Sequence, residues 1–235
     1  SMQILTEAIF LILIGGAVGT LSGLLGIGGG LVIVPVLTYV LIHFHQVAFE
    51  EAILMSIGTS LASIIFTAGM SSFFHTKRNN MNWSISGNYI PGVLLGSSTM
   101  SFIIPHLHIS IIKHAFVIYT FLAAYEILKT PKIKSTVALP SFPLANIYGF
   151  IIASISTIIG IGGGTMFVPY FVYHKINPRL AVALSSSLGA FIGIGASIGF
   201  VSNGMHIDHL PSFSFGYIYL PGLLLMTSSS LFFAK

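Results

Sequence analysis

The chain carries the same glycine-rich motif twice, and these two stretches are its best candidates for ligand chemistry. The motif Gly-Ile-Gly-Gly-Gly occupies residues 26–30 and recurs 134 positions later at residues 160–164. Glycine lets a ligand approach the backbone closely. An apolar segment follows each motif, and if it starts a helix there, its first N–H groups have no partner within the helix. Together with the positive end of the helix dipole, these groups predict a paired site for about one small oxyanion.

Hydroxyl side chains that could complete such a site follow in the next apolar segment of each half. Thr59-Ser60-Leu61 in the first half corresponds to Ser186-Ser187-Leu188 in the second. Hydroxyls can bind a sulfur or carboxyl oxyanion, but bonding back to the preceding helical turn is an equally good explanation of them. The candidate substrate-binding residues are Gly28, Gly29, Gly30, Thr59, Ser60, Gly162, Gly163, Gly164, Thr165, Ser186 and Ser187. Candidate hinge or structural positions are Gly26, Pro35, Gly160 and Pro169.

Other kinds of site find little support in the sequence, and we predict no catalytic residue, metal site or cofactor. A phosphate-binding loop would need Lys-Ser or Lys-Thr after its glycines, which neither motif has. The closely spaced histidine pairs lack a carboxylate or cysteine companion that would make a metal site specific. No Asp, Glu, Lys or Arg is expected near the centre of a membrane span, which argues against a carboxylate proton relay.

The composition places the chain in a membrane. Hydrophobic residues make up 54% and charged residues only 6%, with a mean hydropathy of +0.96, values beyond those of water-soluble domains. The net charge of +4 rests on few side chains, so a nucleic-acid partner is excluded. Long stretches lack charge altogether, such as the 42 residues between Glu7 and Glu50, and each can hold at least one span of about 20 residues.

These stretches predict an all-α polytopic membrane protein of about nine helical segments. They are expected near residues 6–25, 31–44, 50–73, 85–104, 110–129, 144–159, 165–174, 179–202 and 214–233. The motifs recur in the same order in both halves, ending with Tyr-Ile-Pro-Gly at 89–92 and Tyr-Leu-Pro-Gly at 219–222. We therefore expect a first membrane repeat at 2–129, a loop at 130–142, and a second repeat at 143–235 that lacks the last helix of the first.

Length and charge together predict that each glycine motif is the tip of a V-shaped helical hairpin. As one helix, residues 6–44 would span roughly 58 Å, against about 30 Å of hydrocarbon. Counting two arms per hairpin puts eight basic residues on one side of the membrane and Lys113 alone on the other. The positive-inside rule then predicts an outward N-terminus and an inward C-terminus. Five segments per repeat make the repeats inverted, as in many secondary transporters.

The doubled motif and its surroundings closely resemble the TauE/SafE family of sulfite and organosulfonate permeases. The resemblance is carried by residues 21–35 and 159–169, and it extends to the turn at 75–78 and to the Pro-Gly elements at Pro91 and Pro221. It implies transport of a small anion such as sulfite, sulfoacetate or another organosulfur compound across a bacterial inner membrane, with no ATPase of its own. Members of the family usually continue past the position of Lys235.

Taken together, these observations predict a secondary transporter and not an enzyme. It would move a small sulfur-containing anion by alternating access between the two glycine tips. Its partners would be this anion and the lipid bilayer, and a homo-oligomer is compatible with the pattern. The alternative is a membrane scaffold or assembly subunit, whose glycines would serve only the close packing of helices.

Overall fold

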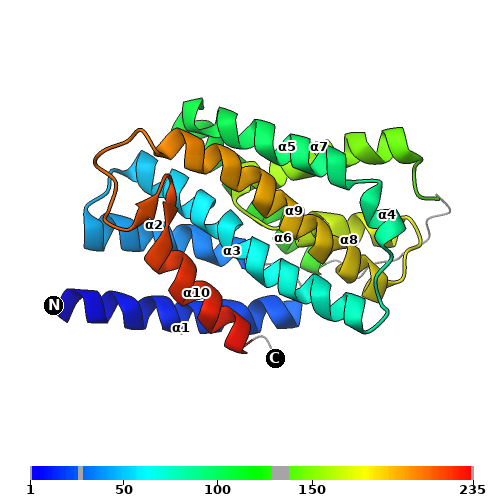
Figure 1. The fold of residues 1–235 in the computed structure, drawn as a ribbon, viewed down its shortest axis with the longest axis horizontal. Helices are drawn as coiled ribbons and strands as arrows, with labels where there is room; N and C mark the ends of the chain where they lie inside the picture. The colour runs from blue at the N-terminus through cyan, green and yellow to red at the C-terminus, as the bar shows by residue number, and fades with distance from the viewer. Residues whose placement is uncertain (1, 26–28, 129–137, 234–235) are drawn as a thin grey trace.

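The computed structural model describes residues 2–25, 29–128 and 138–233, and nearly all of them are helical (Figure 1). The helices are α1 (Met2–Leu25), α2 (Gly30–His45), α3 (Phe49–Lys77), α4 (Trp83–Gly87), α5 (Ile90–Ile103), the 3-10 helix η1 (Ile104–His106), α6 (Ile109–Leu128), α7 (Phe142–Ile159), α8 (Gly164–Tyr173), α9 (Pro178–Gly204) and α10 (Leu220–Phe233). A two-stranded antiparallel ribbon, β1 (Ser214–Phe215) and β2 (Ile218–Tyr219), precedes α10.

The expected all-α polytopic membrane architecture is confirmed. Within the described residues, the nine longer helices fall on the nine predicted segments. Three of them, α3, α7 and α9, are long and apolar enough to cross a membrane, and shorter apolar helices accompany them. The glycine motifs lie between α1 and α2 and between α7 and α8, so each motif separates two helices as predicted.

Two predicted segments do not form one continuous helix. The segment predicted at 85–104 is divided into α4 and α5, and the segment predicted at 214–233 begins with the β1–β2 ribbon. In both places the long helix starts just before the proline of the Pro-Gly element, Pro91 or Pro221. Proline lacks an N–H group and is best accommodated in the first turn of an α-helix. The prolines therefore fix where α5 and α10 begin.

The helices of the two halves make corresponding contacts. At the centre, α3 packs along α9 (Figure 1). The contact of α2 with α3 has its counterpart in that of α8 with α9, and α1 packs on α10 as α7 packs on α5. Finally, α5 also contacts α9, as α10 contacts α3. The helices thus pair in the way a duplicated chain would pair them, and the inverted orientation of the halves stays a prediction.

Small residues allow the outer helices to touch closely. A Cβ atom added at Gly92 or Gly96 of α5 would lie 2.0 or 2.4 Å from a backbone oxygen of α7. On α1, a Cβ added at Gly15 or Gly19 would lie 2.8 or 2.5 Å from backbone atoms of α10. These glycines have the packing role that small residues commonly have in membranes.

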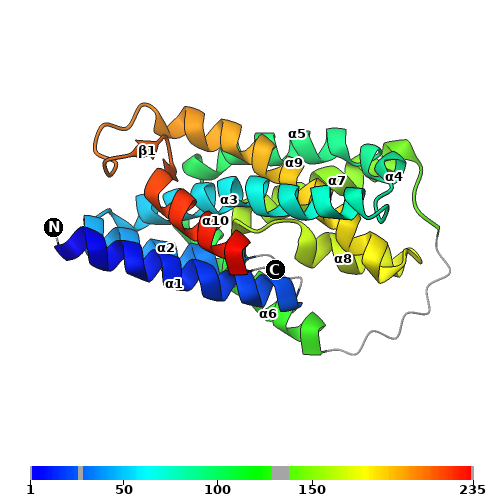
Figure 2. The ribbon, with the colours of Figure 1, turned by 60° about the horizontal axis from the view of Figure 1, so that its bottom comes forward.

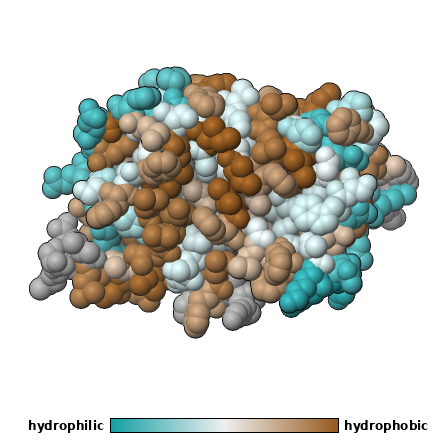
Figure 3. All heavy atoms as spheres, in the orientation of Figure 1, coloured by the Kyte–Doolittle hydropathy of each residue, from teal (hydrophilic) through white to brown (hydrophobic). Residues whose placement is uncertain are grey.

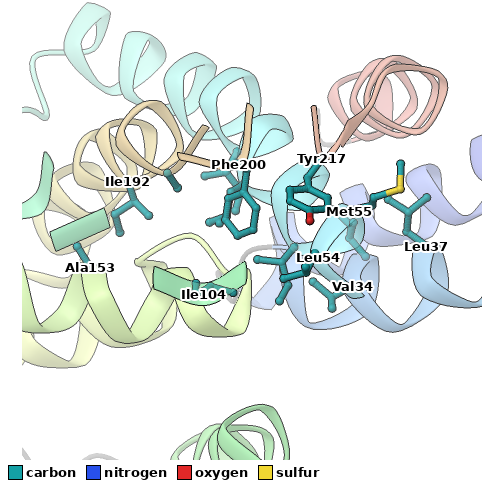
Figure 4. Packing of buried hydrophobic residues seen from close by; sticks show 14 of the residues in the cluster. Val34, Leu37, Leu54, Met55, Ile104, Ala153, Ile192, Phe200 and Tyr217 are labelled. Carbon is teal, nitrogen blue, oxygen red and sulfur yellow. The ribbon is translucent and has the colours of Figure 1, made fainter. Parts of the chain in front are cut away.

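Apolar side chains fill the interior and also cover much of the outside. The close-up in Figure 4 shows core residues from many elements meeting between α3 and its neighbours, among them Leu54, Ile192 and Phe200. On the outside, large apolar side chains stay exposed, such as Phe121 at 74% and Leu13 at 67%. Figure 3 shows apolar residues across the middle of one face and hydrophilic ones toward its ends. Such a surface suits the hydrocarbon of a bilayer.

The two ends of the molecule differ in charge. The N-terminus, the α2–α3 junction and the β1–β2 ribbon lie at one end, and α4 and the α8–α9 turn lie at the other (Figures 1 and 2). Four of the five acidic residues belong to the first end, namely Glu7, Glu50, Glu51 and Asp208, whereas Glu126 lies in the last turn of α6. Basic residues belong to the second: Lys77, Arg78, Lys175 and Arg179. Lys113 lies at the acidic end, where its Nζ is 4.4 Å from the centre of the Phe49 ring.

Candidate functional site

The two glycine motifs touch each other through backbone atoms. A Cβ atom added at Gly30, the first residue of α2, would lie 2.3 Å from the carbonyl oxygen of Gly160 and 2.8 Å from Cα of Ile161. The same Gly160 oxygen accepts a hydrogen bond of 2.7 Å from the Oγ of Ser60, which belongs to α3. Of the first motif, Gly26 and Gly28 lie outside the described residues, whereas Gly29 is the N-cap of α2.

Glycine is required where the chain leaves α7. Gly160 has a φ of 78°, in the left-handed region that side chains with a Cβ rarely adopt. The N–H groups of Gly160 and Ile161 both donate to the carbonyl oxygen of Ser156, at 3.0 Å each. This common type of C-cap satisfies the last turn of α7 and reverses the chain toward α8.

The start of α8 presents backbone donors without acceptors. Within the described residues, no acceptor is found for the N–H groups of Gly162, Gly163, Gly164 and Thr165. Gly162 and Gly163 are buried, and the Gly163 carbonyl already accepts from the N–H groups of Met166 and Phe167. Buried N–H groups at the N-terminus of a helix carry positive partial charge and are costly to leave unpaired. This arrangement can bind an anion.

Other elements surround these donors at short range. A Cβ added at Gly189 of α9 would lie 3.8 Å from the backbone nitrogen of Gly163. On the other side, the hydroxyl of Tyr119 in α6 donates to Oγ1 of Thr165. The candidate hinge residues Pro35 and Pro169 lie inside α2 and α8, one turn beyond the glycines, with exposed side chains.

The structure brings only some of the predicted hydroxyls to the glycine motifs. Ser60 and Thr165 are there. Thr59 instead accepts a 2.9 Å hydrogen bond from the N–H of Tyr219. Ser186 is 3.0 Å from the hydroxyl of Ser71 on α3, and Ser187 is bonded to Ser86 on α4. These three side chains tie α3 and α9 to neighbouring segments.

A small cavity adjoins the first motif, and the sequence did not predict its lining. It measures about 20 Å³ and lies between Gly29 and hydroxyl side chains of α3 and α10. These are Ser63, Thr67, Thr227 and Ser230. The buried Oγ1 of Thr227 has no hydrogen-bond partner in the described part of the chain. In this conformation the cavity has room for about one water molecule.

A buried ionisable cluster is the second feature that the sequence did not reveal. The carboxylate of Glu7, with a side chain only 10% exposed, is 2.9 Å from Nε2 of His45 and 2.7 Å from the hydroxyl of Tyr219. The sequence showed no carboxylate beside the histidine pairs, whereas the packed helices bring Glu7 to His45. The sequence marked only one member of this cluster, Tyr219, which is the counterpart of Tyr89 in the repeated Tyr-x-Pro-Gly elements.

Comparisons with known proteins agree with this architecture. The family described as "Sulfite exporter TauE/SafE" matches residues 11–235. A probable membrane transporter protein of Haemophilus influenzae is 35% identical over 234 residues, which cover 98% of this chain and 87% of the relative. Probable membrane transporter proteins of Methanocaldococcus jannaschii and Bacillus subtilis are 28% and 24% identical, covering 96% and 86% of this chain and 83% and 81% of theirs. No solved structure matches the chain.

The family match favours the predicted transporter over the scaffold that the sequence left open. It covers residues 11–235 and therefore both glycine motifs. The family consists of membrane transporters and not of enzymes. The chain therefore belongs to the TauE/SafE sulfite exporter family and is a multi-pass membrane transporter.

Proposed function

We propose that the protein carries a small sulfur-containing anion, such as sulfite or an organosulfonate, and binds it between the two glycine motifs. The observation that carries this proposal is the row of N–H groups at Gly162–Thr165, two of them in buried residues, that find no acceptor among the described residues. The anion would receive hydrogen bonds from these groups, and the dipole of α8 would add to its binding. Because the Gly30 backbone packs directly on the second motif, the first motif stands close enough to take part.

Transport would require the two hairpins, which are in contact, to move apart. Gly30 and Gly160 now touch, and the adjoining cavity has room for about one water molecule. Binding an anion of several heavy atoms requires the motifs to separate, which would open the site toward one side of the membrane at a time. This is alternating access, and the corresponding helix contacts of the two halves support inverted repeats as its structural basis.

The distribution of charge supports an orientation in the membrane. The basic end, with the α3–α4 and α8–α9 turns, would face the cytoplasm of a bacterial inner membrane. The acidic end, with the N-terminus, would face outward. Lys113 at the acidic end is the exception already expected from the sequence.

Thermal stabilisation in detergent tests the anion site directly. We would compare sulfite, thiosulfate, sulfate, taurine, sulfoacetate and simple carboxylates as ligands of the purified protein. A ligand at 100 times its dissociation constant adds about 2.7 kcal/mol to the free energy of unfolding. We expect a raised melting temperature with a sulfur oxyanion and none with the carboxylates. Equal stabilisation by all these anions would contradict a selective site.

Gly189→Ala is the variant that separates binding from folding. Its new methyl group would meet the nearest heavy atom, Cβ of Ala68, at an ordinary 3.5 Å, but it would lie 3.8 Å from the Gly163 nitrogen and obstruct an anion there. Gly69→Ala is the matched control, because a Cβ at Gly69 meets nothing within 4 Å. Both changes favour helix by about 1 kcal/mol. We expect only Gly189→Ala to lose the anion-dependent shift, and a shift retained in full would refute the site.

A further inference from the structure

Glu7, His45 and Tyr219 form a closed triangle at the acidic end of the molecule. Nε2 of His45 is 2.9 Å from both Oε1 of Glu7 and the hydroxyl oxygen of Tyr219, and that hydroxyl donates to the same Oε1 at 2.7 Å. Each member comes from a different element, namely α1, the end of α2, and β2. The triangle thus fastens both helices of the first hairpin to the segment that leads into α10.

The hydrogen bonds of this cluster determine which of its atoms hold a proton. Burial raises the pKa of the Tyr219 phenol above its ordinary value, and the hydrogen bond to Glu7 raises it further. Tyr219 therefore keeps its proton and donates it to Glu7. Two acceptor oxygens lie within hydrogen-bond distance of Nε2 of His45, so this nitrogen carries a hydrogen and shares it between them. The other ring nitrogen, Nδ1, takes no part in the triangle, and 27% of the His45 side chain is exposed.

A proton on Nδ1 decides the charge of a buried site. With Nδ1 protonated, His45 and Glu7 form a neutral ion pair. Without this proton, the Glu7 carboxylate keeps its hydrogen bonds from His45 and Tyr219 but loses its positively charged partner. An uncompensated buried charge is strongly destabilising, whereas a hydrogen-bonded pair is tolerated. Proton binding therefore holds α1, α2 and β2 together, and proton loss weakens their contact. Histidine changes charge within the physiological pH range.

The other ionisable groups near this end do not replace either partner. Glu51 of α3 is engaged 2.6 Å from His209 of the α9–β1 loop. His43 of α2 is stacked on Tyr39 and bonded to its carbonyl oxygen. At this end the adjoining elements also carry Glu50 of α3, His206 and Asp208 of the α9–β1 loop, and Tyr217 of the ribbon. Lys113 of α6 lies over the Phe49 ring, and His75 and Lys77 are at the far end of α3. No acidic, basic or histidine residue belongs to α10 as described.

In the part of the chain that the structure describes, the counterpart of the triangle in the other half has no carboxylate. There Tyr89, which corresponds to Tyr219, places its hydroxyl 3.2 Å from that of Tyr170 on α8. Tyr89 is 1% exposed and packs edge-on against Phe167 and Phe171. A histidine lies at this junction too, because the ring of His174 at the end of α8 is 4.5 Å from that of Tyr170. The difference is the carboxylate, which among the described residues only the acidic end brings to its histidine and tyrosine. A buried carboxylate that the equivalent junction does without points to a function.

We propose that Glu7 and His45, capped by Tyr219, form a proton-binding site that couples proton movement to the opening of the first hairpin at the acidic end. The proton-binding part stands on the triangle alone, whereas the coupling rests on the proposed transport. With the proton bound, the hairpin is held against β2 and α10. When the proton leaves, the hairpin is released, and the acidic end can open.

Nuclear magnetic resonance of the full chain with ¹⁵N-labelled histidine tests the proton site without any substrate. The His45 signal is identified as the one missing in His45→Gln, and it is followed between about pH 5 and about pH 8. We expect Glu7→Gln to move the His45 midpoint to lower pH, because the partner that favours the charged ring is gone. Glu51→Gln, which removes the acid of the exposed pair, should leave His45 unchanged. A His45 midpoint that is the same in Glu7→Gln as in the wild type would overturn the proposal.

If Glu7→Gln does not fold, a second pair of variants tests the same site. Tyr219→Phe keeps the ring and removes one hydrogen bond of the triangle, and it should shift the His45 midpoint. Tyr89→Phe, the counterpart change, should not. Identical midpoints in these two variants would also contradict the proposed site.

Transport by reconstituted vesicles tests the coupling. We would compare counterflow of sulfite or sulfoacetate at equal pH with uptake driven by an imposed pH gradient. Glu7→Gln should lose the stimulation by the gradient, measured relative to its own counterflow. Equal stimulation in the variant and the wild type would refute the coupling. A wild type without counterflow would contradict the proposed function and the coupling with it, while the His45 titration would still decide proton binding.

Discussion

Ser60 connects the central helix α3 to the second glycine motif through a single buried hydrogen bond. Its hydroxyl, fully buried, donates to the Gly160 carbonyl at 2.7 Å. The sequence could predict that Ser60 lies near a glycine motif, because the repeat marks both as landmarks. It could not predict that Thr59 turns toward Tyr219 or that Glu7 meets His45. Those contacts join residues 160 and 38 positions apart, and only the packed helices bring them together.

Replacing Ser60 with alanine should destabilise the protein by about 1–3 kcal/mol, because the buried Gly160 carbonyl would lose this hydrogen bond. The melting temperature in detergent, measured without ligand, should fall. Ser228→Ala is the matched control, since the exposed Ser228 hydroxyl bonds only to the carbonyl of Leu225 in its own helix. If both variants melt at the same temperature as the wild type, the Ser60–Gly160 bond does not hold the motif in place.

At the level of elements, the closest helix contacts occur at glycines, which have no side chain. The apolar segments were predictable because membrane helices leave a strong hydropathy signal. The short α4 and the β1–β2 ribbon were not, since both consist of a few residues inside apolar stretches. The glycines of α5 and α1 show a different limit. Sequence alone could not tell which glycines serve helix packing, whereas the structure shows what lies opposite each glycine.

Gly96→Val tests the contact between α5 and α7. A Cβ at Gly96 would lie 2.4 Å from the carbonyl oxygen of Phe150, so the two helices must move apart. Overpacking of this kind typically costs 1–3 kcal/mol. We expect a lower melting temperature and a smaller yield of monodisperse protein. Gly69→Val puts the same residue into open space on α3 and should show neither effect beyond the loss common to valine in helices. Equal behaviour of the two variants would refute a packing role for Gly96.

For the whole molecule, the predicted orientation in the membrane depends on the separation of charge between the two ends. Apart from Lys113 and Glu126 of α6, the described acidic and basic residues belong to opposite ends in the structure, as the two-arm interpretation of each hairpin requires. A single crossing for each glycine-broken element would have mixed them. The charge pattern therefore links the hairpins to the topology, and the side of the membrane that each end faces can be measured independently of transport.

The chain has no cysteine, so single cysteines report their location without background. We would introduce Asn79→Cys at the α3–α4 turn and Ser212→Cys in the α9–β1 loop, both at exposed positions at opposite ends of the molecule. In intact bacterial cells, a membrane-impermeant maleimide should label Ser212→Cys at once and Asn79→Cys only after the membrane is permeabilised, because the basic end faces inward. The reverse pattern would show that the charges do not set the orientation. Labelling of both sites in intact cells would show that the two ends do not lie on opposite sides of the membrane, and would refute the spanning arrangement itself.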